Sequence, residues 1–67
     1  MYYSHYDNAG RPFGLSAKRV QFIVRKYSLE KRRIYGRMAV NSDQFDQAME
    51  KEGISMLPNY TRIRLKK

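Results

Sequence analysis

Residues 33–53, RIYGRMAVNSDQFDQAMEKEG, hold the clearest element boundaries in the chain. From 33 to 40, apolar and polar side chains alternate with the period of two that is typical of a strand with one buried face. Gly36 within that run indicates a bulge or a close approach of the backbone. Residues 42–52 follow without a linker and have the periodicity of a helix. This stretch therefore predicts one strand that passes directly into one helix.

The predicted helix, residues 42–52, has a clear start, apolar stripe and end. Asn41 or Ser42 is a suitable N-cap, and Gln44 follows Asn41 at the spacing of a capping box. Three apolar residues recur at the i, i+3 and i+4 spacing of one helix face: Phe45, Ala48 and Met49. Gly53 is a natural left-handed residue after the last turn. We expect this helix to pack on the apolar face of the strand.

The segment before this unit, residues 17–27 (AKRVQFIVRKY), allows two interpretations. As a helix it is capped by Ser16 and aligns Ala17, Val20, Val24 and Tyr27 on one face. As a strand over 19–27 it places Val20, Phe22 and Val24 on one face. The density of β-branched and aromatic residues favours the strand. Lys18 and Arg19 also favour it, because cations in a first helical turn oppose the helix dipole. We therefore predict a strand.

The two ends of the chain add further strand signals. Residues 2–14 combine three tyrosines with a turn-forming DNAG segment, which predicts an N-terminal hairpin. We expect residues 1–15 to lie at the periphery of the domain, as this hairpin or as an arm. In residues 60–66, apolar and polar side chains alternate again and predict a last strand. We expect it to pair with the central hairpin, which consists of the predicted strands 19–27 and 33–40 joined by a loop over 28–32. The expected fold is α+β in a single domain, residues 1–67. A sheet of three to four antiparallel strands (about 19–27, 33–40, 60–66 and the N-terminal hairpin) carries the one helix on one face.

The alternative architecture is a compact winged helix in which residues 17–27 are helical. That order of elements resembles the small excisionase-type DNA-binding proteins, and the resemblance implies a basic helix in the major groove and a wing at the minor groove. Separately, residues 2–15, YYSHYDNAGRPFGL, are similar to the tyrosine- and glycine-punctuated hairpins of arm-binding integrase domains. Neither segment contains a diagnostic motif, so no family is assigned.

Charge is distributed unevenly along the chain. The formal net charge is +8, from 14 Lys and Arg against 6 Asp and Glu. Residues 18–37 contain eight basic residues against one acid, and residues 62–67 add four basic residues. Residues 43–52 contain four acids against one base. A basic body with one acidic helix is expected to be steered toward polyanions by its basic side.

Several function classes lack support in the sequence. There is no cysteine and a single histidine, His5, so neither a thiol nucleophile nor a metal site is expected. No P-loop, dinucleotide-binding glycine motif or nucleophile elbow occurs. We expect no enzyme activity, no cofactor, no membrane segment and a cytoplasmic location.

The outward sheet face and the adjacent hairpin loop form the predicted site. Arginine side chains contact phosphates and tyrosine rings stack on bases, so a face that mixes them is typical of nucleic-acid surfaces. The face comprises Arg25, Tyr27, Arg33, Tyr35, Arg37, Tyr60, Arg62 and Arg64, and the loop over 30–33 adds Lys31 and Arg32 beside Arg33. These residues predict a small regulatory or accessory protein that binds nucleic acid, DNA rather than RNA, with modest or no sequence selectivity. The alternative is a regulator or inhibitor that docks on a protein partner, such as a nucleic-acid-handling enzyme in a larger complex.

Overall fold

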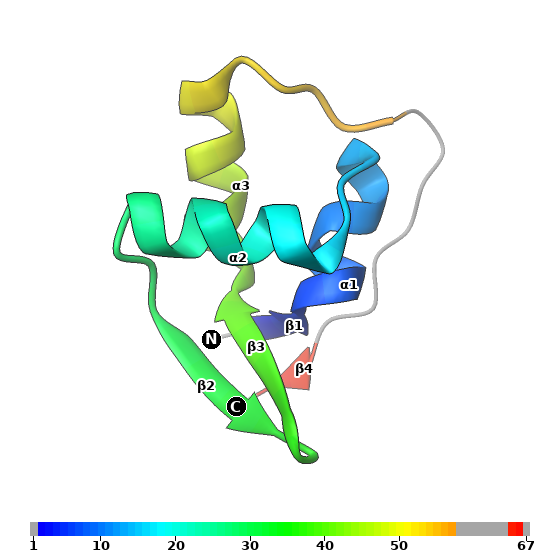
Figure 1. The fold of residues 1–67 in the computed structure, drawn as a ribbon, viewed down its shortest axis with the longest axis vertical. Coiled ribbons are helices and arrows are strands. Elements are labelled where there is room, and N and C mark those ends of the chain that lie inside the picture. Colours follow the sequence, from blue (N-terminus) through cyan, green and yellow to red (C-terminus); the bar gives the residue numbers. More distant parts are fainter. Residues whose placement is uncertain (1, 58–64, 67) are drawn as a thin grey trace.

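The computed structural model describes residues 2–57 and 65–66. In chain order its elements are β1 (Tyr2–His5), α1 (Tyr6–Gly10), η1 (Arg11–Phe13), α2 (Ala17–Lys26), β2 (Lys31–Ile34), β3 (Arg37–Asn41), α3 (Ser42–Glu52) and β4 (Leu65–Lys66). The chain is an α+β fold, as predicted, and the predicted helix over 42–52 is confirmed with the same bounds. Figure 1 shows the helices grouped on one side, while the β2–β3 hairpin extends away from them.

The sheet is antiparallel throughout and has the strand order β2-β3-β1-β4. β1 lies in its interior, where Tyr3 pairs with Asn41 on one side and with Leu65 on the other. The predicted N-terminal hairpin over 2–14 was therefore wrong, as was the peripheral position of residues 1–15. The turn-forming DNAG segment forms α1 instead, because Tyr3 and Ala9 bury their side chains in the molecule.

α2 is the main correction to the sequence analysis, because residues 19–27 were predicted to form a strand. The Ser16 side chain caps the helix by accepting a hydrogen bond from the Arg19 amide at 3.3 Å. Three β-branched residues are buried at the i, i+3 and i+4 spacing: Val20, Ile23 and Val24. Burying each of them contributes about 1.5–3 kcal/mol, whereas misplaced charge in the first turn costs about 0.3–1 kcal/mol. Packing therefore outweighs both strand propensity and the unfavourable charge.

Residues 33–40, predicted to form one strand, instead contain the turn between the antiparallel strands β2 and β3. Tyr35 and Gly36 form its two-residue turn, with φ of 53° and 73° respectively. Two consecutive positive φ values are typical of a type I′ turn, which matches the twist of the flanking strands. The turn reverses the chain in the middle of the predicted strand, so Ile34 pairs with Arg37.

The core lies between Val40 of β3 and the helices, and Phe45, Ile23 and Met49 are its largest buried members. Phe13 of η1 packs edge-on against Phe45 with ring centroids 5.8 Å apart. α1 and α2 approach closely at Gly10, where an added Cβ would lie 2.5 Å from Cγ2 of Val20. Glycine at this position is what allows the two helices to pack together.

The predicted last strand, residues 60–66, falls mostly outside the described residues. Its described part, β4, pairs with β1 and not with the central hairpin as expected. No described helix is both long enough and apolar enough to cross a membrane.

Candidate nucleic-acid interface

α2 has one face in the core and the opposite face in solvent. The exposed face carries four cations, one amide and one aromatic ring: Lys18, Arg19, Gln21, Phe22, Arg25 and Lys26. No acidic residue occurs within the helix. The basic face of α2, defined by these six residues, follows directly from its helical geometry, since every third or fourth residue is taken up by the core.

Phe22 is unusual on this basic face because 57% of its surface is exposed. The Arg19 guanidinium lies 5.9 Å from the centre of its ring, a cation–π distance. Together with Ser16 and Lys18, these two side chains line a shallow hollow of about 270 Å³ at the start of the helix. The hollow has cationic walls and an apolar side, a combination that suits a phosphate next to a base or sugar.

The other end of α2 is fixed to α3 through Glu52. The Tyr27 hydroxyl donates a hydrogen bond to the Glu52 carboxylate, and Lys26 Nζ lies 2.9 Å from the same oxygen. The bond from Tyr27, followed by that from Lys26, lowers the pKa of Glu52. The half-buried Tyr27 ring also lies near the ammonium groups of Lys26 and Lys51, at 5.5 and 5.8 Å. These contacts hold the direction of α2, so Tyr27 has a structural role, and its stacking on bases stays a prediction.

The β2–β3 hairpin carries the second group of cations. Cross-strand partners share a sheet face, and side chains alternate along each strand. Lys31 and Arg33 therefore share a face with Met38, while Arg32 and Arg37 lie on the other face. The predicted common face of Arg33, Tyr35 and Arg37 was wrong, because the turn at 35–36 changes the alternation. Tyr35 instead occupies the tip, with 85% of its surface exposed.

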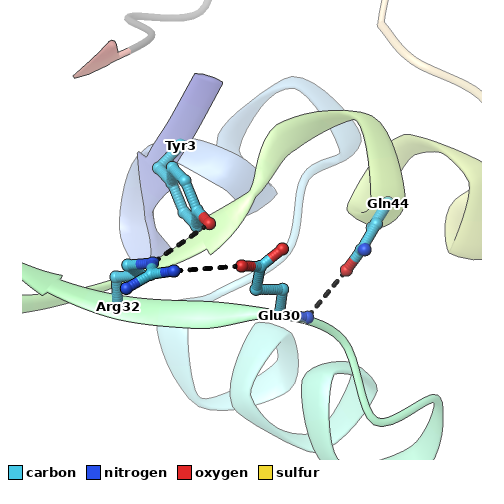
Figure 2. A network of polar contacts seen from close by, with 4 residues as sticks. All are labelled: Tyr3, Glu30, Arg32 and Gln44. Carbon is cyan, nitrogen blue, oxygen red and sulfur yellow. Dashed lines mark hydrogen bonds and ion pairs between the residues drawn. The ribbon is translucent and has the colours of Figure 1, made fainter. Parts of the chain in front are cut away.

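The root of the hairpin is held by a polar network that Figure 2 shows. Arg32 Nε donates to the Tyr3 hydroxyl at 3.3 Å, and Arg32 Nη2 lies 3.4 Å from a Glu30 carboxylate oxygen. The Glu30 amide donates to the Gln44 side chain at 2.7 Å. The network therefore connects β1, β2 and the first turn of α3. Arg32 is engaged in it through two contacts, whereas its neighbour Arg33 donates one hydrogen bond, from Nη1 to the Gly36 carbonyl at 3.2 Å.

A second cross-link spans β3, the strand between β1 and β2. His5 and Arg32 are both cross-strand partners of Ala39, so all three lie on one sheet face. The His5 imidazole reaches past Ala39, and its Nε2 donates to the Ile34 carbonyl at 2.8 Å. Ala39 is fully buried, and its small side chain leaves room for this contact. His5 therefore helps to position the hairpin.

An ion pair connects the hairpin to α1. Arg37 Nη2 lies 2.7 Å from Asp7 Oδ2, and burial of Asp7 opposes its ionisation. The hydrogen bonds from Arg37 and from the Asn8 amide outweigh that burial and lower the pKa of Asp7. Asp7, Arg37 and Ala17 line one small cavity of about 220 Å³ with Tyr6 and Met38. The start of α2 and strand β3 are thus neighbours across this cavity.

The predicted site residues fall into three groups. Arg25 lies on the basic face of α2, whereas Lys31, Arg33 and Tyr35 lie exposed on the hairpin. Tyr27, Arg32 and Arg37 are held in contacts within the protein. Arg62 and Arg64 lie outside the described residues. The sequence analysis missed Lys18, Arg19, Gln21 and Phe22 as site residues, although the helical interpretation of 17–27 would have placed them on one exposed face.

Cations without a carboxylate partner gather on α2 and the hairpin. Within residues 2–57, three cations form ion pairs: Lys26, Arg32 and Arg37. Seven other cations of residues 2–57 are exposed and form no ion pair with a described residue. Five of them lie on α2 and the hairpin, namely Lys18, Arg19, Arg25, Lys31 and Arg33, and the other two are Arg11 and Lys51. The described residues also contain no group of three or more His, Cys, Asp or Glu that could hold a metal ion. The surface is therefore suited to contact with an extended anion.

Comparison with known proteins found no matching family model, no matching curated protein and no matching solved structure.

Proposed function

We propose that this protein binds duplex DNA, with the basic face of α2 in the major groove and the β2–β3 hairpin over the adjacent sugar–phosphate backbone. The observation that carries the proposal is the composition of the α2 face, which has four cations, an amide and an aromatic ring but no acid. Lys and Arg supply the phosphate contacts that dominate nucleic-acid affinity, and an α-helix fits the major groove of B-DNA.

The arrangement of α1 and α2 supports this orientation. α1 and η1 are followed by three residues, 14–16, and then by α2, which is the order of a short helix–turn–helix. In that motif the second helix lies in the groove while the first helps to hold it. Here the first helix contacts the second through Gly10 and leaves the basic face of α2 uncovered.

The same geometry favours DNA over double-stranded RNA. The major groove of A-form RNA is deep and narrow, and side chains on a helix cannot read it. The hairpin complements the helix because it places Lys31 and Arg33 on one of its faces and Tyr35 at its tip. We assign Lys31 and Arg33 to phosphate contacts and Tyr35 to contact with sugar or base edges beside the groove.

Fluorescence anisotropy with a labelled duplex of about 20 base pairs tests the proposal. For about six phosphate contacts, the logarithm of the binding constant should fall with the logarithm of salt concentration with a slope near −5. A double-stranded RNA of the same sequence should bind more weakly. The absence of binding to any duplex DNA at about 50 mM salt would contradict the proposal.

Matched variants separate the interface from general charge. Replacing Lys31 and Arg33 together with alanine should reduce the salt slope by about two, because two phosphate contacts are lost. Arg11→Ala in η1 is the control, since Arg11 is exposed, lies outside α2 and the hairpin, and forms no ion pair with a described residue. An equal change in slope per charge removed for the control would contradict the assignment to the hairpin.

A further inference from the structure

We infer that α2 makes DNA binding sequence-selective, with Gln21, Phe22 and Arg25 as the residues that read bases. This inference rests on the proposed function and extends it, because phosphate contacts alone carry no sequence information. The reading residues would recognise a short site that contains adenine and guanine about two base pairs apart, with a thymine methyl group next to them.

The spacing of the three residues places them together on the helix. Gln21 and Arg25 are four residues apart, and Phe22 lies three before Arg25, so the side chains are neighbours on the exposed face. Four residues of helix rise by about 6 Å. That rise corresponds to roughly two base-pair steps, since successive base pairs are about 3.4 Å apart. The three side chains can therefore reach neighbouring base edges at the same time.

The side chains of Gln21 and Arg25 are free for a ligand. Within the described residues, the Gln21 side-chain amide forms no hydrogen bond and the Arg25 guanidinium forms no ion pair. Gln44, by contrast, uses its side chain to accept from the Glu30 amide. Lys26, which follows Arg25, is paired with Glu52. Gln and Arg are the side chains that bind adenine and guanine respectively through two hydrogen bonds in the major groove.

The Phe22 ring is available to a ligand. It contributes little to the core, with 57% of its surface in solvent, and the Arg19 guanidinium lies 5.9 Å from its centre. In a groove the ring can contact the methyl group of thymine, the only apolar group on a major-groove edge. Arg19, which lies over the same ring, is then directed toward the flanking phosphate.

Selection of bound duplexes from a random library tests the inference directly. We expect enrichment of a site with adenine and guanine about two base pairs apart. Arg25→Lys should reduce the preference for guanine by about 5- to 150-fold, because lysine keeps the charge but loses the two-bond geometry. Its affinity for unselected duplex should stay close to that of the unchanged protein. Gln21→Ala should lose the preference at adenine in the same way, whereas Gln47→Ala on α3 should change nothing.

A change in the DNA isolates the role of Phe22. Replacing the contacted thymine by deoxyuridine removes only the methyl group, and this should weaken binding by the unchanged protein. Phe22→Ala should bind both duplexes equally, because its partner for the methyl group is gone. A penalty for deoxyuridine that persists in Phe22→Ala would overturn the role of Phe22.

The inference and the proposed function fail in different ways. If the protein binds DNA with a salt slope near −5 but enriches no sequence, the inference is overturned and the proposed function stands. The inference is also overturned if Gln21→Ala and Arg25→Lys select the same site as the unchanged protein. If no duplex is bound at all, both are overturned.

Discussion

α2 and α3 are built alike in their backbone and core contacts but differ in the face they show to solvent. They have 10 and 11 residues, and each begins at a side-chain cap, Ser16 or Asn41. Each buries three apolar residues at i, i+3 and i+4, and α3 also buries Ser42. Each ends in the two hydrogen bonds of a Schellman motif, around Ser28 and Gly53. Packing therefore constrains the buried stripe of each helix and leaves the residues of its exposed face free to differ.

The charges of the two helices differ in their relation to the helix dipole. α3 has Asp43 in its first turn and Lys51 in its last, and both positions are favourable. α2 has Lys18 and Arg19 in its first turn and no acid there, an arrangement that costs about 0.3–1 kcal/mol. The dipole therefore accounts for Asp43 and Lys51, but not for Glu50 and Glu52 in the last turn of α3 or for Lys18 and Arg19. The proposed contact with phosphate would give Lys18 and Arg19 a role.

The largest expected effect contrasts the phenylalanines of the two helices. Phe45→Ala should reduce the free energy of unfolding by about 3–5 kcal/mol, because a fully buried ring is lost from the core. Phe22→Ala should change it by less than about 0.5 kcal/mol, since the ring is largely exposed. Urea unfolding followed by circular dichroism measures both. Similar losses in the two variants would mean that α2 does not have the described orientation.

The contact between α1 and α2 can be broken at Gly10. Gly10→Ala adds a Cβ only 2.8 Å from the Leu15 carbonyl oxygen, as well as the 2.5 Å contact with Val20. The backbone must shift, and overpacking of this kind costs about 1–3 kcal/mol. Asn8→Ala in the same helix is the control, because its side chain forms no hydrogen bond with a described residue. Thermal unfolding should show a clear loss for the first variant only.

The residues that follow the two helices can be interchanged, with glycine at position 28 and serine at position 53. Ser28 has a φ of 52°, whereas the equivalent residue after α3 is Gly53 with a φ of 73°. Ser28→Gly should stabilise the protein by about 1 kcal/mol, because glycine adopts the left-handed conformation without steric cost. Gly53→Ser should destabilise it by a similar amount. Urea midpoints that move in the same direction for both variants would contradict the shared geometry of the two helix ends.

The smallest expected effect concerns the contact between the two helix ends at Glu52. The folded protein lowers the pKa of Glu52 through the Tyr27 and Lys26 bonds, so the unfolded chain binds protons more readily. The contribution is fully present above the usual glutamate pKa of 4.5 and is lost as pH falls through the lower folded value. Glu52→Gln should therefore show a smaller loss of stability between pH 5 and pH 3, measured by urea midpoints. An unchanged pH profile would show that the contact does not form in solution.

α3 was predictable because its signals are local. The Asn41 cap, the stripe that contains Phe45 and the left-handed Gly53 all lie within 13 consecutive residues, and each is confirmed. α2 offers the same kinds of signal, but its buried residues are β-branched, and strand propensity competes with helical periodicity over so short a run. The Ser16 cap indicated a helix, whereas strand propensity and the cations Lys18 and Arg19 in the first turn both favoured a strand.

The hairpin turn escaped the sequence analysis for a different reason. Type I′ turns usually contain Asn-Gly or Asp-Gly, since both central residues need positive φ. A tyrosine with φ of 53° is an uncommon choice, so Tyr35-Gly36 resembled the middle of a strand with a bulge. Because the turn was missed, Arg33 and Arg37 were placed on one face although they lie on opposite faces of the hairpin. The candidate site could not be assembled correctly from that register.

The sequence by itself determined the net charge, the segregation of acids onto α3, the bounds of α3 and the α+β class. These depend on composition and on contacts within a few turns of one element. Only the tertiary structure decided that residues 17–26 are helical, because the apolar run could be buried either as a helix or as a strand. β1 occupies the sheet interior next to β3, and Gly10 lets α1 pack closely against Val20. With the sheet position taken and a helical partner in place, α2 buries its three β-branched residues and leaves Lys18, Gln21 and Arg25 on the exposed face.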